Sequence, residues 1–315
     1  VRWSAQIAQE MAISTAILPL ESLRQTETFL DNEYAVLRHV EAALLQRVSQ
    51  RLRTFIQQRL KGFWASQQPE IKKRWEVIAA AATVLAEAER VGDALKGKSW
   101  RAAALITSYA HGAAPWCLLD TAQRHLERDF HQFDPDGSQH DDLLKLVAHA
   151  RHRYAETTER LAERFITAYA AEHFELSGLL AQVDIFREHL AATTGRRAYL
   201  LVDALRFEMA RELLELLDNR WTTALDPALA AVPTITEVGM AALMPGSDRS
   251  LTIEPATNDK LDVVVAGKRL RSRTDRIKHF PAVVGGDTTD VTLEQLAPLT
   301  NKALQKRLEK ANTIL

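Results

Sequence analysis

The chain has 315 residues, of which 46% are hydrophobic and 26% charged, and its formal net charge is -1 at pH 7. These values describe a globular protein large enough for two domains, and they exclude a global basic field for nucleic acid. A single cysteine, Cys117, excludes an internal disulfide and suits a reducing compartment, and no apolar run or leader pattern indicates a membrane, so we expect a cytoplasmic protein.

Residues 1–195 are predicted to form an all-helical bundle or array that serves as a docking or scaffold domain. Apolar residues recur at helix spacing from Ile7 to Leu23, and again from Leu37 to Leu60 as one stripe on a long helix. The pattern breaks at Pro69, and a further long helix is predicted from Asp141 to His173. No repeat of fixed period accompanies these helices.

The helix predicted from Leu37 to Leu60 has a basic face. Its members are Arg38, Arg47, Arg51, Arg53 and Arg59. Such a face could lie along a nucleic-acid backbone, but a solvated helix face is the commoner meaning of such charge, and we favour it.

The loop from His131 to Asp142 gathers acidic residues and resembles a cation-binding loop at first sight. A calcium loop that began at Asp134 would need Glu at its twelfth position, where Lys145 stands. Asp-Pro-Asp-Gly is also a turn sequence. We therefore favour a structural loop over a metal site.

Two consecutive apolar stretches each end at a polar side chain. Ala198–Val202 is predicted to be a buried strand that delivers Asp203 to the mouth of a loop, before a helix that contains Met209 and Leu213. Ala228–Val232 is the second stretch, and Thr236 follows it where a new helix would begin. The carboxyl ends of strands are where α/β sheets collect ligands, so these residues predict a phosphoryl-transfer site.

The two motifs VDALRFEMARELL and VPTITEVGMAALMPG resemble the PglZ domain, which belongs to the alkaline phosphatase superfamily and occurs in bacterial BREX phage-defence systems. The resemblance implies an α + α/β architecture, in which the helical domain of residues 1–195 is followed by the first half of an alkaline-phosphatase-like domain over residues 196–315. It implies Asp203 as a metal ligand, and Thr236 as both a metal ligand and the nucleophile. Zn is the expected metal, with Mg or Mn as alternatives.

Each of these residues also has a structural interpretation. Asp203 could cap the following helix through its unpaired N–H groups. Thr234 and Glu237 form a T-x-x-E capping box, so Thr234 is the better N-cap and Thr236 the expected nucleophile. Arg206 could hold a phosphate oxygen or pair with Glu208.

Beyond Gly246 the sequence predicts a β-hairpin from LTIEP and LDVVVAG, and then a dense basic run. Lys268, Arg269, Arg271 and Arg273 in this run could contact a phosphodiester backbone, or they could form an exposed, soluble turn and helix start. A final amphipathic helix is expected before a terminal strand.

The superfamily completes its two-metal site with further Asp and His ligands, including an Asp-His pair, and no Asp-His dipeptide occurs here. We expect those ligands beyond Leu315, and this chain alone to bind metal weakly and to be inactive. The resemblance implies a metal-dependent phosphatase, phosphodiesterase or nuclease that docks other BREX proteins through its helical region and acts on DNA or another phosphate ester. The alternative is a non-catalytic scaffold or interaction hub.

Overall fold

The computed structural model of the protein describes residues 27–97, 99–133, 140–176, 178–217, 220–256, 261–309 and 311–315. The helical pattern of Ile7–Leu23 and the loop residues Asp134 and Asp136 lie outside these ranges. The chain divides into two compact units, the first ending at Leu176 and the second starting at Ser177.

The boundary between the units differs from the position near residue 195 expected from the sequence. The segment before residue 195 packs with the second unit, because the side chain of Gln182 donates to the carbonyl oxygen of Gly239 at 3.2 Å. The same side chain accepts from the backbone N–H of Ala231 at 2.9 Å.

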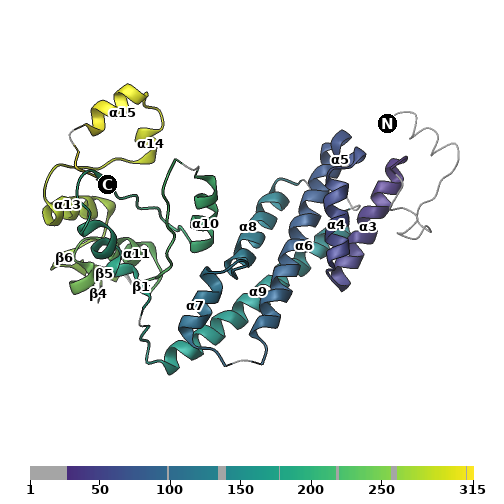
Figure 1. The fold of residues 1–315 in the computed structure, drawn as a ribbon, viewed down its shortest axis with the longest axis horizontal. Coiled ribbons are helices and arrows are strands. Elements are labelled where there is room, and N and C mark those ends of the chain that lie inside the picture. The colour runs from purple at the N-terminus through teal and green to yellow at the C-terminus, as the bar shows by residue number, and fades with distance from the viewer. Residues whose placement is uncertain are drawn as a thin grey trace. The chain divides into compact units, whose positions relative to one another are not determined.

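The first unit is helical throughout its described part. Its helices are α3 (Leu30–Gln46), α4 (Gln50–Leu60), α5 (Phe63–Gln67), α6 (Pro69–Leu95), α7 (Ala102–Ala110), α8 (Cys117–His131) and α9 (Asp141–Ala171). In Figure 1, α6 runs alongside α8 and α9, and it makes extensive contacts with both. The predicted helical region and its long last helix are confirmed.

The single long helix predicted from Leu37 to Leu60 is wrong, because the chain forms two helices there. The backbone becomes extended at Arg47 after α3 ends. Ser49 then starts α4 as its N-cap, with its hydroxyl accepting from the N–H of Leu52 at 3.2 Å. An apolar stripe does not reveal such a break, because α3 and α4 each bury their apolar residues and the stripe continues from one helix into the next.

The core of the first unit encloses two ion pairs among its apolar side chains. Arg74 and Glu41 are 2% and 0% exposed, and they join through two hydrogen bonds of 2.8 and 2.9 Å. Arg59 pairs with Glu33 at 3.2 Å, and both are buried. The solvated-face interpretation is therefore wrong for Arg59, whereas Arg38, Arg47 and Arg51 are exposed and Arg53 is half-buried.

The second unit contains short strands and helices. Its strands are β1 (Leu180–Ala181), β2 (Arg197–Ala198), β3 (Ala228–Leu229), β4 (Thr252–Pro255), β5 (Leu261–Val265), β6 (Lys268–Arg269), β7 (Thr288–Thr289) and β8 (Thr313–Ile314). Its helices are a 3-10 turn (Gln182–Asp184), a π-helix (Phe186–Ala191), α10 (Phe207–Leu216), α11 (Thr236–Ala242), α12 (Ser247–Ser250), α13 (Arg273–Val284), α14 (Leu293–Leu296) and α15 (Asn301–Leu308).

The strands form small sheets of both kinds. β1 pairs with β3 in parallel, and β2, β8 and β7 form a parallel sheet in that order. β4, β5 and β6 form an antiparallel sheet, which confirms the predicted hairpin and adds a third strand. The α + α/β architecture predicted from the sequence is confirmed. The expected final helix, by contrast, is two helices, α14 and α15.

The core of the second unit is small and partly aromatic. Tyr199 and Phe280 are buried with ring centroids 6.1 Å apart, and Phe186 packs edge-on against Phe280 at 5.7 Å. Val238 of α11 and Val263 of β5 belong to the same buried cluster. None of the helices in the described part of the chain is long and apolar enough to cross a bilayer.

Candidate active site

The segment that leads to Asp203 is covered on one face. β2 pairs with β8 over two residue pairs, and the N–H of Tyr199 extends the ladder by donating to the carbonyl oxygen of Ile314 at 2.8 Å. Tyr199 is 8% exposed, but Leu200 is 77% exposed and Val202 is also exposed. The predicted buried strand from Ala198 to Val202 is therefore wrong, since alternate side chains face outward as they do on a sheet with one covered face.

Asp203 lies in the turn that follows, and it is exposed. The next residue, Ala204, has a φ of 54°, a left-handed conformation that costs a residue with a Cβ about 1–2 kcal/mol. The helix α10 begins at Phe207 with Arg206 as its N-cap and without a side-chain cap. Asp203 therefore does not cap α10, and its carboxylate remains available at the turn.

Thr236 is the first residue of α11, and Ile235 is the N-cap. The capping box predicted for Thr234 is absent, because the N–H of Ile235 turns back to the carbonyl oxygen of Pro233 at 2.8 Å and the first helical bond runs from Gly239 to Ile235. This tight turn moves the helix start past Thr234. It leaves the Thr236 hydroxyl at the edge of the helix, facing Asp203.

The two predicted site residues meet in the structure. The hydroxyl of Thr236 lies 3.4 Å from both carboxylate oxygens of Asp203, although 33 residues separate them in sequence. Hydrogen bonds of this length are weak. The spacing suits a second use, because two oxygen ligands of one tetrahedral zinc ion, each at about 2.0–2.2 Å, lie roughly 3.4 Å apart.

A complete metal centre needs more than these two ligands. Across the residues that the structure describes, no three His, Cys, Asp or Glu side chains converge to hold an ion. The Asp203–Thr236 pair has the spacing of one edge of a metal site, to which it would supply two oxygens.

Arg206 forms the ion pair that the sequence left open as an alternative. Its guanidinium lies 2.8 Å from the Glu208 carboxylate, which is fully buried. The Arg206 side chain is 57% exposed. The binding of phosphate by Arg206 stays a prediction. It would require the guanidinium to contact the Glu208 carboxylate and the phosphate at the same time.

Several arginines of the basic run after β5 lie next to carboxylates. Arg271 makes a bidentate pair with Asp262, and Arg269 lies 3.3 Å from the same carboxylate. The Arg271 guanidinium holds the pKa of Asp262 below its ordinary value. Arg273 lies 3.6 Å from Asp290, and Lys268 is exposed. These ion pairs neutralise part of the positive charge that the sequence suggested for nucleic-acid binding.

Arg276 is a charged residue near the candidate site that the sequence pattern did not distinguish from its basic neighbours. It lies on α13 and is half-buried. Burial lowers the pKa of Arg276, whereas the nearby carboxylates of Asp275, Glu237 and Asp203 oppose that shift. The charges of Asp203 and Glu237 therefore act on its guanidinium, and only the fold could show this, because α13 begins far along the chain from both.

The string Gly92–Ser99 matches the phosphate-loop pattern G-x-x-x-x-G-K-S. That pattern carries a phosphate only when a strand precedes it and a helix follows it. Here Gly92 lies inside α6, which ends at Leu95. Its residues up to Gly97 are therefore the end of a helix and the turn after it, and they are not positioned as a phosphate loop.

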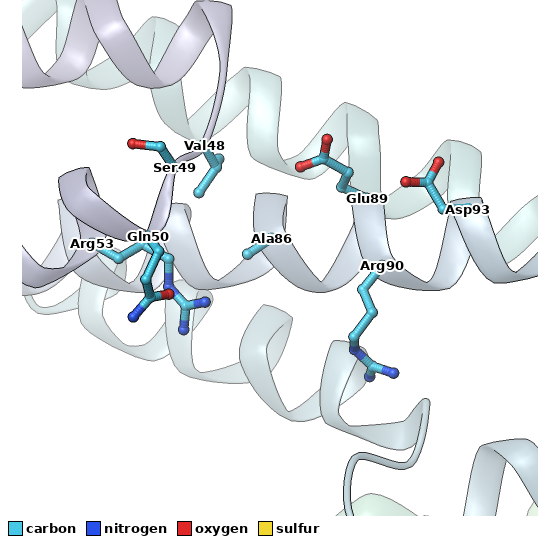
Figure 2. A pocket seen from close by; sticks show the side chains of 8 residues that line it. All are labelled: Val48, Ser49, Gln50, Arg53, Ala86, Glu89, Arg90 and Asp93. Atoms are coloured by element: carbon cyan, nitrogen blue, oxygen red, sulfur yellow. The ribbon is translucent and has the colours of Figure 1, made fainter.

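A shallow cavity of about 260 Å³ lies on the first unit, where α4 begins next to α6 (Figure 2). Glu89, Arg90 and Asp93 lie on the α6 side, and Ser49 and Arg53 lie at the start of α4. Arg90 already pairs with Glu87 and donates to the carbonyl oxygen of Ala114 at 2.9 Å. The cavity has mixed charge and no nucleophile with a neighbouring base.

The second unit thus combines small parallel sheets with a hydroxyl and a carboxylate that meet at a loop. Residues 184–315 match the family model described as BREX system PglZ alkaline phosphatase-like domain. The chain therefore carries a PglZ domain of the BREX type, preceded by a helical region. No curated protein and no solved structure matches the chain.

Proposed function

We propose that this protein is a metal-dependent phosphatase or phosphodiesterase of a BREX phage-defence system, with Thr236 as its nucleophile. The observation that carries the proposal is the contact of the Thr236 hydroxyl with the Asp203 carboxylate at 3.4 Å. A hydroxyl needs a neighbouring group that holds it and takes its proton, and Asp203 is such a neighbour.

In this mechanism Thr236 Oγ1 attacks the phosphorus of a phosphate ester in line, and the bond between phosphorus and the leaving oxygen breaks. The hydroxyl proton leaves along the hydrogen bond toward Asp203. The departing oxygen takes a proton from solvent. Water then attacks phosphorus, the bond between phosphorus and Thr236 Oγ1 breaks, the phosphoryl product leaves, and the proton on Asp203 returns to the threonine oxygen. A divalent cation bound to the Asp203 carboxylate and Thr236 Oγ1 would lower the pKa of the hydroxyl and offset charge on the phosphoryl group. Zinc is the ion we expect, with magnesium or manganese as alternatives.

The position of the pair supports an external substrate. Asp203 and Thr236 are both exposed, and the residues that flank them on the surface include the exposed side chains of Val202 and Ile235. An open site of this kind admits a large phosphodiester such as DNA as readily as a small phosphomonoester. The basic side chains of Lys268 and Arg273 would contribute to the binding of DNA.

The second candidate function is a non-catalytic scaffold or interaction hub of the BREX complex. It is favoured by the lack of a three-ligand metal group among the described residues and by the large, well-packed helical unit. In both candidates the helical region docks other BREX proteins.

The experiment that separates the candidates measures bound metal and hydrolysis of a generic phosphomonoester, a generic phosphodiester and DNA by the full-length protein. We expect Thr236→Ala to abolish turnover while metal is retained, and Asp203→Asn to lose both. Thr234→Ala is the matched control, because Thr234 is an exposed neighbouring hydroxyl without a cap role. Equal turnover by wild type and Thr236→Ala would refute the proposed nucleophile. Intact phage defence in Asp203→Ala and Thr236→Ala would favour the hub.

A further inference from the structure

Two cavities adjoin on the first unit along the line where α4 packs beside α6. The first has a volume of about 260 Å³ and is the cavity of Figure 2. The second has a volume of about 210 Å³ and reaches Gln57 of α4 and Ala79 of α6. Gln50 and Arg53 line both cavities, so together the two form one groove, which we call the α4–α6 groove.

The floor of the α4–α6 groove is a row of alanines on α6. Ala79, Ala82 and Ala86 recur at helix spacing and line the groove. Their side chains are single methyl groups, so another chain can approach the helix closely there. The lining continues along α6 to Asp93, about 21 Å from Ala79 at a rise of about 1.5 Å per residue. An extended chain of about six residues has that length.

The α4 wall of the groove carries polar side chains without partners. Gln50, Arg53 and Gln57 lie at i, i+3 and i+7 and so share one face of α4. Their side chains make no hydrogen bond or ion pair with the residues that the structure describes. A glutamine amide has two N–H donors and an acceptor oxygen, and a guanidinium has five N–H donors. This wall therefore offers donors and acceptors to a ligand.

The α6 side of the groove has the opposite charge. Glu89 is exposed, and in the described part of the chain its carboxylate has no ion pair or hydrogen bond. The neighbouring Arg90 does not neutralise it, because the Arg90 guanidinium pairs with Glu87 at 2.5 Å. The groove thus presents an unpaired cation, Arg53, on one helix and an unpaired carboxylate on the other.

These features favour an extended peptide over other occupants. A docked amphipathic helix needs pockets for large apolar side chains, whereas this groove has a floor of alanines and polar walls. A helix also bonds its own backbone groups, and these would not pair with Gln50 and Gln57. The carboxylates of Glu89 and Asp93 would repel a nucleic-acid backbone.

An extended peptide, by contrast, exposes its backbone N–H and C=O groups. Gln50 and Gln57 lie about 10.5 Å apart along α4, which is the length of about three extended residues. Their amides can therefore bind successive backbone groups of one peptide.

We propose that the α4–α6 groove binds an extended peptide segment of a partner protein, with an acidic side chain that pairs with Arg53 and a basic one that pairs with Glu89. The inference rests on the docking role proposed for the helical region, and it names the docking site and the chemistry of the partner segment. It is independent of the chemistry at Asp203 and Thr236.

The test measures binding of the full protein to an array of hexapeptides with blocked ends, in which one Glu and one Lys occupy every pair of positions among alanines. We expect one order of Glu and Lys to be preferred, because Arg53 and Glu89 fix the direction of the charges. Fluorescence polarisation then gives the affinity of the best peptide. Arg53→Glu should weaken it by about tenfold to a hundredfold, the loss typical of a charged hydrogen-bonding group.

A charge exchange distinguishes recognition from a structural effect. The double variant Arg53→Glu, Glu89→Lys should bind the peptide in which Glu and Lys have exchanged positions. Arg38→Glu is the matched control, because Arg38 is exposed on α3 and lies outside the groove lining. Thermal unfolding of each variant confirms that it is folded.

The outcomes are independent of turnover, so this inference and the proposed nucleophile stand or fall separately. Peptide binding that is lost in Arg53→Glu, kept in Arg38→Glu and reversed in the double variant supports the inference, even if Thr236→Ala leaves turnover unchanged. Equal affinity in wild type and Arg53→Glu overturns it, as does binding no stronger than that of an all-alanine hexapeptide. A dimer or a complex with a DNA oligonucleotide that Arg53→Glu dissociates, without peptide binding, assigns the groove to that occupant and also overturns the inference.

Discussion

Glu41 and Arg74 form a buried ion pair, and we predict that removing Glu41 lowers the free energy of unfolding more than removing Arg74. Glu41→Gln removes the carboxylate that accepts two hydrogen bonds from the Arg74 guanidinium, which is 2% exposed. A guanidinium cannot lose its proton in a protein, so we expect a loss of about 3–5 kcal/mol in the free energy of unfolding.

Arg74→Met leaves a carboxyl that can become neutral. Burial raises the pKa of Glu41 and the hydrogen bond from Arg74 opposes that shift, so loss of Arg74 raises the pKa further. At about 1.4 kcal/mol per pH unit over the interval from pH 7 to the ordinary value of 4.5, protonation of Glu41 costs at most about 3.5 kcal/mol, near the lower end of the loss expected for Glu41→Gln. The electrostatic loss in Arg74→Met is therefore smaller than in Glu41→Gln.

The pH dependence has a definite sign. A carboxyl with a raised folded pKa binds its proton more tightly in the folded state, so stability is greatest below pH 4.5 and falls as the pH rises through the raised value. Lowering the pH from 7 to 5 should therefore shrink the deficit of Arg74→Met relative to wild type. The deficit of Glu41→Gln should not shrink, because the charge that remains in this variant is that of the Arg74 guanidinium, which does not titrate in this range.

Urea unfolding of the full protein followed by tryptophan fluorescence is the assay, since Trp64, Trp75, Trp100 and Trp116 all lie in the first unit. With a slope of about 2 kcal/mol per M, a loss of 4 kcal/mol lowers the midpoint by roughly 2 M. Lys96→Ala is the control, because its pair with Asp93 is 71% and 61% exposed and should be worth less than about 1 kcal/mol. A smaller loss for Glu41→Gln than for Arg74→Met at pH 7, or equal deficits at both pH values, would refute the reasoning.

Two further predictions concern local features. Ser49→Ala should cost about 1 kcal/mol in urea unfolding, because it removes the hydroxyl that accepts from the N–H of Leu52, whereas Thr234→Ala should be nearly neutral because Thr234 caps no helix. A similar loss in both variants would contradict the observed helix starts. The lowered pKa of Asp262 means that its pairing with Arg271 stabilises the fold above pH 3.8 and is lost as the pH falls through the lowered value. The stability difference between wild type and Asp262→Asn should thus be constant from pH 7 to 5 and shrink below 3.8, and a difference that grew on acidification would be the contrary result.

The sequence by itself determined the helical first region, the hairpin and the two motifs of the site. Apolar spacing shows which face of a helix is buried, and Pro69 marks the predicted break, which the structure places between α5 and α6, because both are local properties. The motifs around Asp203 and Thr236 predicted an alkaline-phosphatase-like domain, which the match over residues 184–315 confirms.

The tertiary structure decided which residues have partners. The break at Ser49, the burial of Arg59 with Glu33 and the exposure of Leu200 each depend on what packs against the segment, and a one-dimensional pattern does not contain that information. The same holds for Arg276, which the sequence shows as one cation in a basic run. Only the packing of α13 on Tyr199 and Pro245 brings it within electrostatic reach of Asp203, because the approach of distant segments is fixed by the whole core.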